Sequence, residues 1–195
     1  MPNTSAADVL RVARMLFAID GYAATSIGHI AEAAGLSKSA VLYHYSSKEA
    51  LLEAIITPAV DGLEGVVASF ARSADADPRH EFVEPFVDYL LANRLEMSIF
   101  VNQGQSLRGL PVIDRANGLV QRLGDAVSLG VVRIDDRIRF GMALGGAAYT
   151  VVAAINWTDN ALPSAELEDA DEVRAALVEI VTGLLVASRT SVAAH

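Results

Sequence analysis

The sequence predicts an all-α protein of about nine helices. Apolar residues recur with helical spacing in almost every segment between the glycines and prolines. No segment shows the alternation of a strand over any length. The 195 residues are 52% apolar and 20% charged, so the chain can bury the core of one or two domains and is not disordered.

The first two expected helices are delimited by hydroxyl residues and glycines. The first is expected to begin after Thr4 or Ser5, either of which can cap its amino terminus, and to end at Gly21. The second follows Thr25 and ends at Gly35, because glycine suits the left-handed residue that follows a helix.

The third helix is expected from Ser37 to about Tyr45, and the fourth begins near Ser47. The apolar pattern of the fourth continues past Pro58 to Phe70. A proline inside a helix removes one backbone hydrogen bond, so we expect a bend at Pro58.

The rest of the chain predicts five more helices. Residues 73–80 form the clearest linker, and residues 158–170 are a polar loop before the last helix. The helices are expected near 81–95, 97–107, 112–129, 135–157 and 169–190. We expect their amphipathic faces to pack as a bundle.

Composition excludes several classes of protein. The absence of cysteine excludes disulfides, thiolate metal sites and a cysteine nucleophile. The amino terminus lacks the basic start and apolar core of a signal peptide, so we expect a cytoplasmic protein. The longest uncharged run, 140–158, approaches the length of a membrane span but is rich in weakly apolar residues, which favours a buried helix.

The most informative block is residues 9–56. Within it, the stretch SIGHIAEAAGLSKSAVLYHY has the proportions of two short helices joined by a tight turn. Ala31 is small enough for the helices to cross closely, Gly35 supplies the turn, and Leu36 fills the space between them. Ser37 can cap the second of these helices.

This block resembles the TetR family of transcriptional regulators over about a quarter of the chain. The resemblance implies an amino-terminal helix-turn-helix DNA-binding domain over 1–52 and a ligand-binding and dimerisation domain over 53–195. The residues that carry it are Leu16-Phe17, Gly21-Tyr22, Thr25-Ser26, Ile30-Ala31, Ala34 to Ser37, Tyr43 to Tyr45 and Ser47 to Glu49.

The resemblance also implies a set of DNA contacts at the starts of helices and along the recognition helix. These are Thr25, Ser26, Ser37, Lys38, Ser39, Ala40, Tyr43, His44 and Lys48. Thr25 or Ser26, and Lys48, would contact phosphates, while the recognition helix would face the major groove. The family usually has tyrosine where this chain has Leu42, which either packs inward or touches a thymine methyl.

Charge is distributed in a way that permits this function. Residues 1–52 hold four basic and four acidic residues and include both lysines of the protein. The net charge of −9 therefore belongs to residues 53–195. The acidic segment 53–195 repels phosphate and discourages non-specific binding, while the neutral segment 1–52 can still approach DNA.

The resemblance implies a homodimer that reads a palindromic operator. The last two helices, 135–157 and 169–190, would form the interface with a second subunit. Two recognition helices would then lie about one turn of DNA (~34 Å) apart.

A small, mainly apolar effector is the expected ligand, and no cofactor is expected. Aromatic, apolar and amide side chains of the middle helices are candidates for its pocket, although for any single one of the aromatics a place in the core is the preferred interpretation. The candidates are Phe86, Tyr89, Met97, Phe100, Asn102, Gln103, Asn117, Tyr149, Asn156 and Trp157. We expect the ligand to favour a conformation that cannot bind DNA, with the helix around Pro58 as a lever, so that the protein is a ligand-relieved repressor.

Other functions have less support in the sequence. It has no nucleophile elbow, zinc-protease motif or phosphate-binding glycine loop, so an enzyme is not expected. His80 and His195 are isolated, so no metal site is expected. A metal- or ligand-sensing activator of the same fold is the alternative reading.

Overall fold

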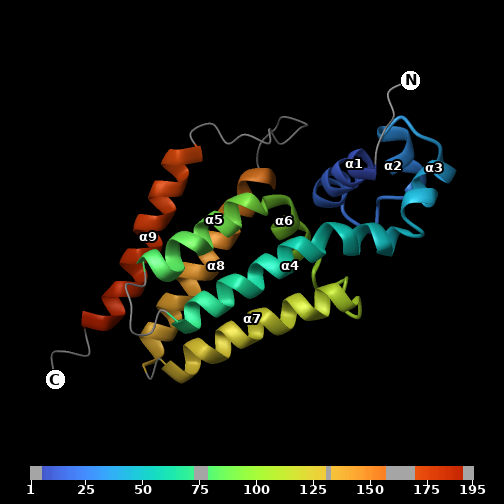
Figure 1. Ribbon diagram of the computed structural model, residues 1–195. Helices are drawn as coiled ribbons and strands as arrows, with labels where there is room; N and C mark the ends of the chain where they lie inside the picture. The colour runs from blue at the N-terminus through green and yellow to red at the C-terminus, as the bar shows by residue number, and fades with distance from the viewer. Residues whose placement is uncertain (1–5, 73–78, 131–132, 157–169, 191–195) are drawn as a thin grey trace. The chain divides into compact units, whose positions relative to one another are not determined.

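The computed structural model describes residues 6–72, 79–130, 133–156 and 170–190, and this part of the chain is all-α, as predicted (Figure 1). Its nine α-helices and one short π-helix are α1 (Ala6–Ile19), α2 (Ile27–Ala33), α3 (Lys38–His44), α4 (Lys48–Arg72), η2 (Arg79–Val83), α5 (Glu84–Ala92), α6 (Arg94–Gln103), α7 (Pro111–Gly130), α8 (Ile134–Asn156) and α9 (Ala170–Thr190). The expected caps Thr4 and Ser5, most of the linker 73–80 and the loop 158–169 lie outside the described residues.

The turn between α2 and α3 has the geometry that the sequence predicts. Gly35 follows the last residues of α2 with a φ of +67°. The amide of Leu36 donates to the carbonyl of Ala31 (2.8 Å), and the amide of Gly35 donates to that of Glu32 (3.0 Å). These two bonds form a Schellman motif, which satisfies the carbonyls at the end of α2.

Pro58 lies inside one continuous helix, α4. Because proline has no backbone N–H, the carbonyl of Ala54 lacks its usual helical donor at this turn. Buried side chains before and after the proline, including Ile55, Ile56, Ala59 and Val60, hold the helix in place.

The contacts divide the chain into two compact units. The first comprises residues 1–61 and 95–116, and the second comprises 62–94 and 117–195. Sequence reasoning placed the boundary after residue 52 and assigned 95–116 to the second part. Those functional domains stay a prediction. Helix α6 makes an ion pair and two hydrogen bonds with α1 and the turn after it, described below, which a local pattern does not reveal.

The core of the second unit is aromatic. Phe82 of η2 is buried, stacks on Phe86 of α5 (5.6 Å between ring centroids) and meets Phe70 of α4 edge-on (4.9 Å). Arg174 of α9 makes a bidentate bond to Asp88 of α5 (2.6 and 3.0 Å) on the surface of this unit. This pair joins α9 to α5.

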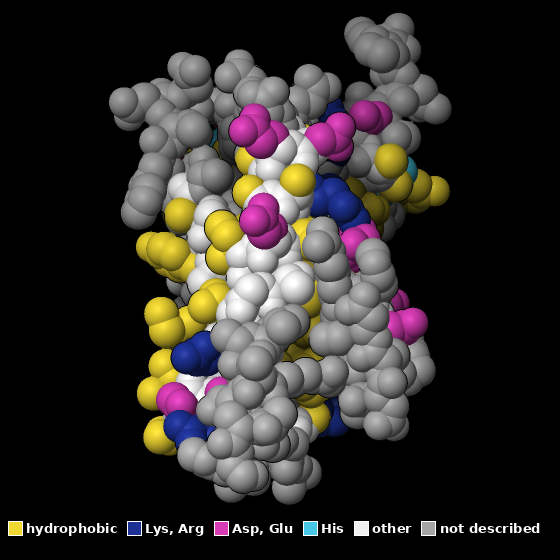
Figure 2. Space-filling model, turned by 90° about the vertical axis from the view of Figure 1, so that its left-hand side faces the viewer, with side chains coloured by type: hydrophobic (Ala, Val, Ile, Leu, Met, Phe, Trp, Pro, Cys, Tyr) yellow, Lys and Arg dark blue, Asp and Glu magenta, His cyan; other side chains and the backbone are white. Residues whose placement is uncertain are grey.

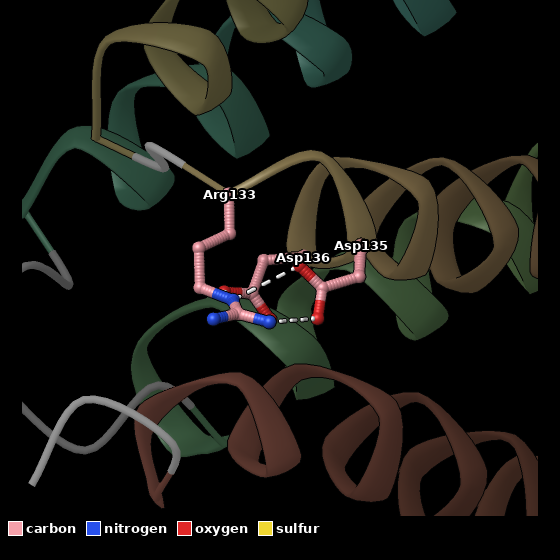
Figure 3. Close-up of polar contacts among 3 residues, drawn as sticks. All are labelled: Arg133, Asp135 and Asp136. Atoms are coloured by element: carbon pink, nitrogen blue, oxygen red, sulfur yellow. Dashed lines mark hydrogen bonds and ion pairs between the residues drawn. The ribbon is translucent and has the colours of Figure 1, made fainter. Parts of the chain in front are cut away.

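The start of α8 is organised by one arginine (Figure 3). Arg133 donates from Nε (3.0 Å) and from a terminal nitrogen (2.9 Å) to the two carboxylate oxygens of Asp135, and its Nε lies 4.0 Å from Asp136. These hydrogen bonds lower the pKa of Asp135. Asp135 and Asp136 both lie in the first turn of α8, where negative charge complements the helix dipole.

Among the described helices, α8 included, none combines the length and apolar character that a membrane crossing requires.

Gly35 offers a test of the turn. Nothing lies within 4 Å of a Cβ placed on Gly35, so Gly35→Ala meets no clash and costs only the left-handed backbone energy. We expect it to lower the free energy of unfolding by about 1 to 2 kcal/mol, measured by urea denaturation followed by circular dichroism.

Gly65 supplies the matched control for this prediction. It lies inside α4 with equally open space, so Gly65→Ala should raise the free energy of unfolding by about 0.5 to 1 kcal/mol. A Gly35→Ala protein as stable as the parent would show that the turn does not need the left-handed residue.

Candidate nucleic-acid interface

Helix α3 presents a polar outer face. Val41 is fully buried and anchors the helix to its unit, while the residues on the other sides are open to solvent. Tyr43 is 87% exposed, and its ring meets that of His44 edge-on at 5.5 Å. The exposed side chains of this helix are Lys38, Ser39, Leu42, Tyr43 and His44, with Ala40 half-buried beside them.

Two serines cap the short helices: Ser37, as the sequence predicts, and Ser26, which was not predicted as a cap. The Ser26 Oγ accepts a hydrogen bond from the amide of His29 (3.1 Å), and the Ser37 Oγ accepts one from that of Ala40 (3.2 Å). Ser37 Oγ also lies 2.9 Å from Ser39 Oγ. Both caps are exposed. A hydroxyl that accepts a capping bond still carries a hydrogen that it can donate.

Thr25 has a different role from the one that the resemblance implies. It is only 1% exposed, and its Oγ1 donates to the carbonyl of Gly21 at 2.8 Å. The hydroxyl therefore closes the turn between α1 and α2 and does not face solvent. Of the Thr25–Ser26 pair, only Ser26 presents its hydroxyl at the surface.

Lys48 is engaged with the same turn. Its Nζ donates to the carbonyls of Tyr22 (2.8 Å) and Thr25 (2.9 Å) and lies 4.2 Å from the centre of the Tyr22 ring. An ammonium group has three N–H donors, so one remains beyond these two bonds. Lys48 thus first holds the backbone that precedes α2, a role that its sequence position did not reveal.

Tyr22 is the centre of this turn. Its phenol donates to Glu49 Oε1 (3.1 Å), and its ring meets Phe17 edge-on (5.1 Å). Burial and the nearby Glu49 charge raise the pKa of Tyr22 to about 12, while a backbone N–H bond and the Ser47 and Tyr22 hydroxyls lower the pKa of Glu49. The phenol therefore remains a donor and the carboxylate an acceptor at neutral pH.

Gln103, at the end of α6, ties this turn to a distant part of the sequence. Its Oε1 accepts from the amide of Tyr22 (2.6 Å), and its Nε2 donates to the carbonyl of Phe17 (2.8 Å). Gly21, between these residues, has a φ of +91°. The sequence singled out Gln103 as a ligand contact because it is an amide in apolar surroundings. In the structure both ends of its amide group make hydrogen bonds to this turn.

A second link between α6 and α1 is an ion pair that sequence reasoning missed. Arg14 Nε lies 2.7 Å from Glu96 Oε1, and the Glu96 side chain is almost fully buried. Burial raises the pKa of Glu96, and the charge of Arg14 only partly opposes this effect. The two residues carry no pattern that marks them as partners, because they are far apart in the chain.

The other candidates for a ligand pocket belong partly to the first unit and partly to the second. Asn102 is exposed and donates to Ser98 Oγ, while Tyr149 is exposed on α8. Phe86 is buried in the aromatic core. The half-buried candidates are Tyr89, Met97, Phe100 and Asn117. Trp157 and the side chain of Asn156 lie outside the part of the chain that the structure describes.

Helix α8 leaves an apolar stripe exposed to solvent. Its members share one face of the helix, and Met142 is 62% exposed. They are Ile134, Ile138, Met142 and Tyr149, with Gly141 and Gly145 between them. On α9, which packs against α8, Ile180 and Gly183 are likewise exposed. Figure 2 looks onto the left-hand side of Figure 1, where α9 is labelled. Hydrophobic side chains, in yellow, follow the left edge of this view.

No three His, Cys, Asp or Glu side chains among the described residues are grouped in a way that could hold a metal ion.

Comparisons with known proteins identify the amino-terminal helices. Residues 9–55 match the family described as bacterial regulatory proteins, tetR family. No curated protein matches the chain in sequence.

Solved structures extend the likeness to the whole chain. PfmR, a TetR family transcriptional regulator from Thermus thermophilus, is 27% identical, with 92% of this chain and 96% of that one covered and a TM-score of 0.57. A TetR-family member from Streptomyces coelicolor is 25% identical, with 91% and 90% covered and a TM-score of 0.66. The ketosteroid transcriptional regulator KstR2 of Mycobacterium tuberculosis, 19% identical with 94% and 95% covered, shares the fold at a TM-score of 0.66.

The role of Gln103 can be measured directly. Gln103→Ala removes both side-chain bonds to the turn, so we expect faster hydrogen exchange at the Tyr22 amide, by about tenfold for a lost bond of about 1.4 kcal/mol. NMR-detected exchange on the folded protein gives the rate.

Asn102→Ala is the control for that measurement. Asn102 is the preceding amide residue of α6, and its side chain bonds only within the helix, to Ser98. Equal exchange at Tyr22 in the Gln103→Ala and parent proteins would contradict the assigned contact.

Proposed function

Since the chain belongs to the TetR family of transcriptional regulators, we propose that it binds a palindromic operator as a homodimer and represses transcription until a small, mainly apolar molecule releases it. The observation that carries this proposal is the outer face of α3. That face presents exposed hydrogen-bond donors and acceptors, while Val41, on the opposite side of the helix, is buried in the unit. We propose that the protein acts in the cytoplasm, where the DNA is.

The proposed DNA contacts fall into two groups. Lys38, Ser39, Ala40, Tyr43 and His44 face the major groove, because the amino-terminal part of a recognition helix reaches base edges. Lys38 is suited to guanine, whose O6 and N7 both accept hydrogen bonds.

Phosphate contacts fix the position of the helix on the duplex. Ser26 and Ser37 have exposed hydroxyls at the starts of α2 and α3. Lys48 keeps one N–H after its two bonds to the turn, and we assign that donor to a phosphate. Thr25 contributes by shaping the turn and not by contact.

The exposed stripe of α8, with Ile180 of α9, supports the homodimer. Isoleucine and methionine side chains that are more than half exposed gain from burial against a second copy. Gly141 and Gly145 on the same face leave open space, which lets a partner helix approach closely.

The aromatic core of the second unit supports an apolar effector. Within it the ring of Phe70 contacts those of Phe82 and Phe140, and Phe82 stacks on Phe86. Apolar ligands bind in sites lined by such side chains with a few polar groups. An effector that binds the DNA-free form more tightly must weaken operator binding by the same factor by which operator weakens effector binding.

Selection of genomic fragments by the purified protein tests DNA binding. We expect a short palindrome, with affinity that falls steeply as salt rises. Lys38→Ala should weaken binding by about 1 to 3 kcal/mol and relax the preference at one base pair in each half-site, measured by fluorescence anisotropy on a panel of operators.

Arg122→Ala is the matched control, because Arg122 is an exposed cation of α7 outside the proposed surface. Equal losses from the two variants, without a change in base preference, would assign the Lys38 effect to net charge alone. Sequence-blind binding by the parent protein would contradict the operator proposal.

The dimer has its own test. The double substitution of Ile138 and Met142 by Asp places charges on the stripe of α8, so we expect a monomer by sedimentation at concentrations where the parent is a dimer. Val120→Asp changes an equally exposed apolar residue of α7 and should leave the dimer intact. A dimeric double variant would place the interface elsewhere.

A further inference from the structure

Leu42 is the feature of α3 that the contacts above do not use. It is 38% exposed, whereas its neighbour Val41 is fully buried and already fills the inward position of the helix. Of the two readings left open by the sequence, inward packing is therefore the one that the structure does not support. A leucine remains open to solvent on a face that is otherwise polar.

The position of Leu42 on the helix places it beside Lys38. The two residues are four positions apart, so they lie on one face of α3 about one turn, or ~5.4 Å, from each other. Val41 precedes Leu42 and points to the core, so the face shared by Lys38 and Leu42 adjoins the outermost residues, Ser39 and Tyr43.

The chemistry of a leucine side chain restricts what it can recognise on DNA. It has no donor or acceptor, so it cannot hold a phosphate or a polar base edge. The apolar group that the major groove presents is the C5-methyl of thymine. We propose that Leu42 reads the methyl group of a thymine in each half-site of the operator. This inference rests on the proposed function, because it assumes that α3 enters the major groove.

The proposal also fixes where that thymine lies. If Lys38 contacts a guanine, a residue ~5.4 Å further along the helix reaches a base within about two steps of 3.4 Å. Each half-site should therefore contain a thymine within about two base pairs of the position whose preference Lys38→Ala relaxes. The thymine can be on either strand.

Uracil substitution isolates the methyl group. Each thymine of the selected operator is replaced in both half-sites by deoxyuridine, which keeps the hydrogen-bonding edge and removes only the C5-methyl. For the parent protein we expect one symmetric position at which this change weakens binding about fifteenfold, from about fourfold per half-site for one apolar carbon. Anisotropy titrations at fixed salt give the affinities.

The same titrations with Leu42→Ala complete a double-mutant cycle. This variant should bind the thymine operator about fifteenfold more weakly than the parent and lose its sensitivity to uracil at that one position. Tyr43→Ala is the control, because it alters the adjacent exposed residue and should keep the uracil sensitivity. Circular dichroism confirms that each variant is folded.

The outcomes distinguish a failure of the Leu42 contact from a failure of the proposed function on which it rests. Binding of the parent to an operator with no uracil-sensitive thymine overturns the Leu42 contact alone. So does a Leu42→Ala protein that keeps the parent's sensitivity at every position. If selection yields no operator, the proposed function fails, and the Leu42 contact fails with it.

Discussion

The turn between α1 and α2 is the constraint on which the first unit depends. Backbone groups of a turn that is packed against other helices must find partners, because unpaired buried groups are costly. Here the partners are side chains: Lys48 takes the carbonyls of Tyr22 and Thr25, and Gln103 takes the amide of Tyr22 and the carbonyl of Phe17. Residues of α4 and α6 therefore hold the backbone of the turn that precedes α2.

This arrangement explains why α6 belongs to the first unit although about 50 residues of sequence separate it from the helix-turn-helix. Gln103 and Glu96 both reach α1 or its turn, one through neutral hydrogen bonds and the other through a buried ion pair. Burial of the Glu96 carboxylate carries a desolvation cost that offsets part of its attraction to Arg14. A change in α6 would therefore bear directly on the backbone that orients the recognition helix.

The exposed faces of α3 and α8 differ in chemistry. The outer face of α3 is polar apart from Leu42, and it is carried by a segment with no net charge. The exposed stripe of α8 is apolar and rich in glycine, which suits association with another protein surface. The remaining charge of the chain is acidic, so the proposed binding to DNA relies on the neutral segment and not on general attraction.

The sequence by itself determined the helices and the local turns. Their signals are local: periodicity sets a helix, Ser26 and Ser37 begin two of them, and Gly35 ends one, so their positions could be predicted. Only the tertiary structure decided what Lys48 and Gln103 do. The bonds of Gln103 join residues 81 and 86 positions apart, and no local pattern encodes such a partner. The buried hydroxyl of Thr25 and the exposed ring of Tyr149 have the same origin, because burial depends on which distant helix covers a residue.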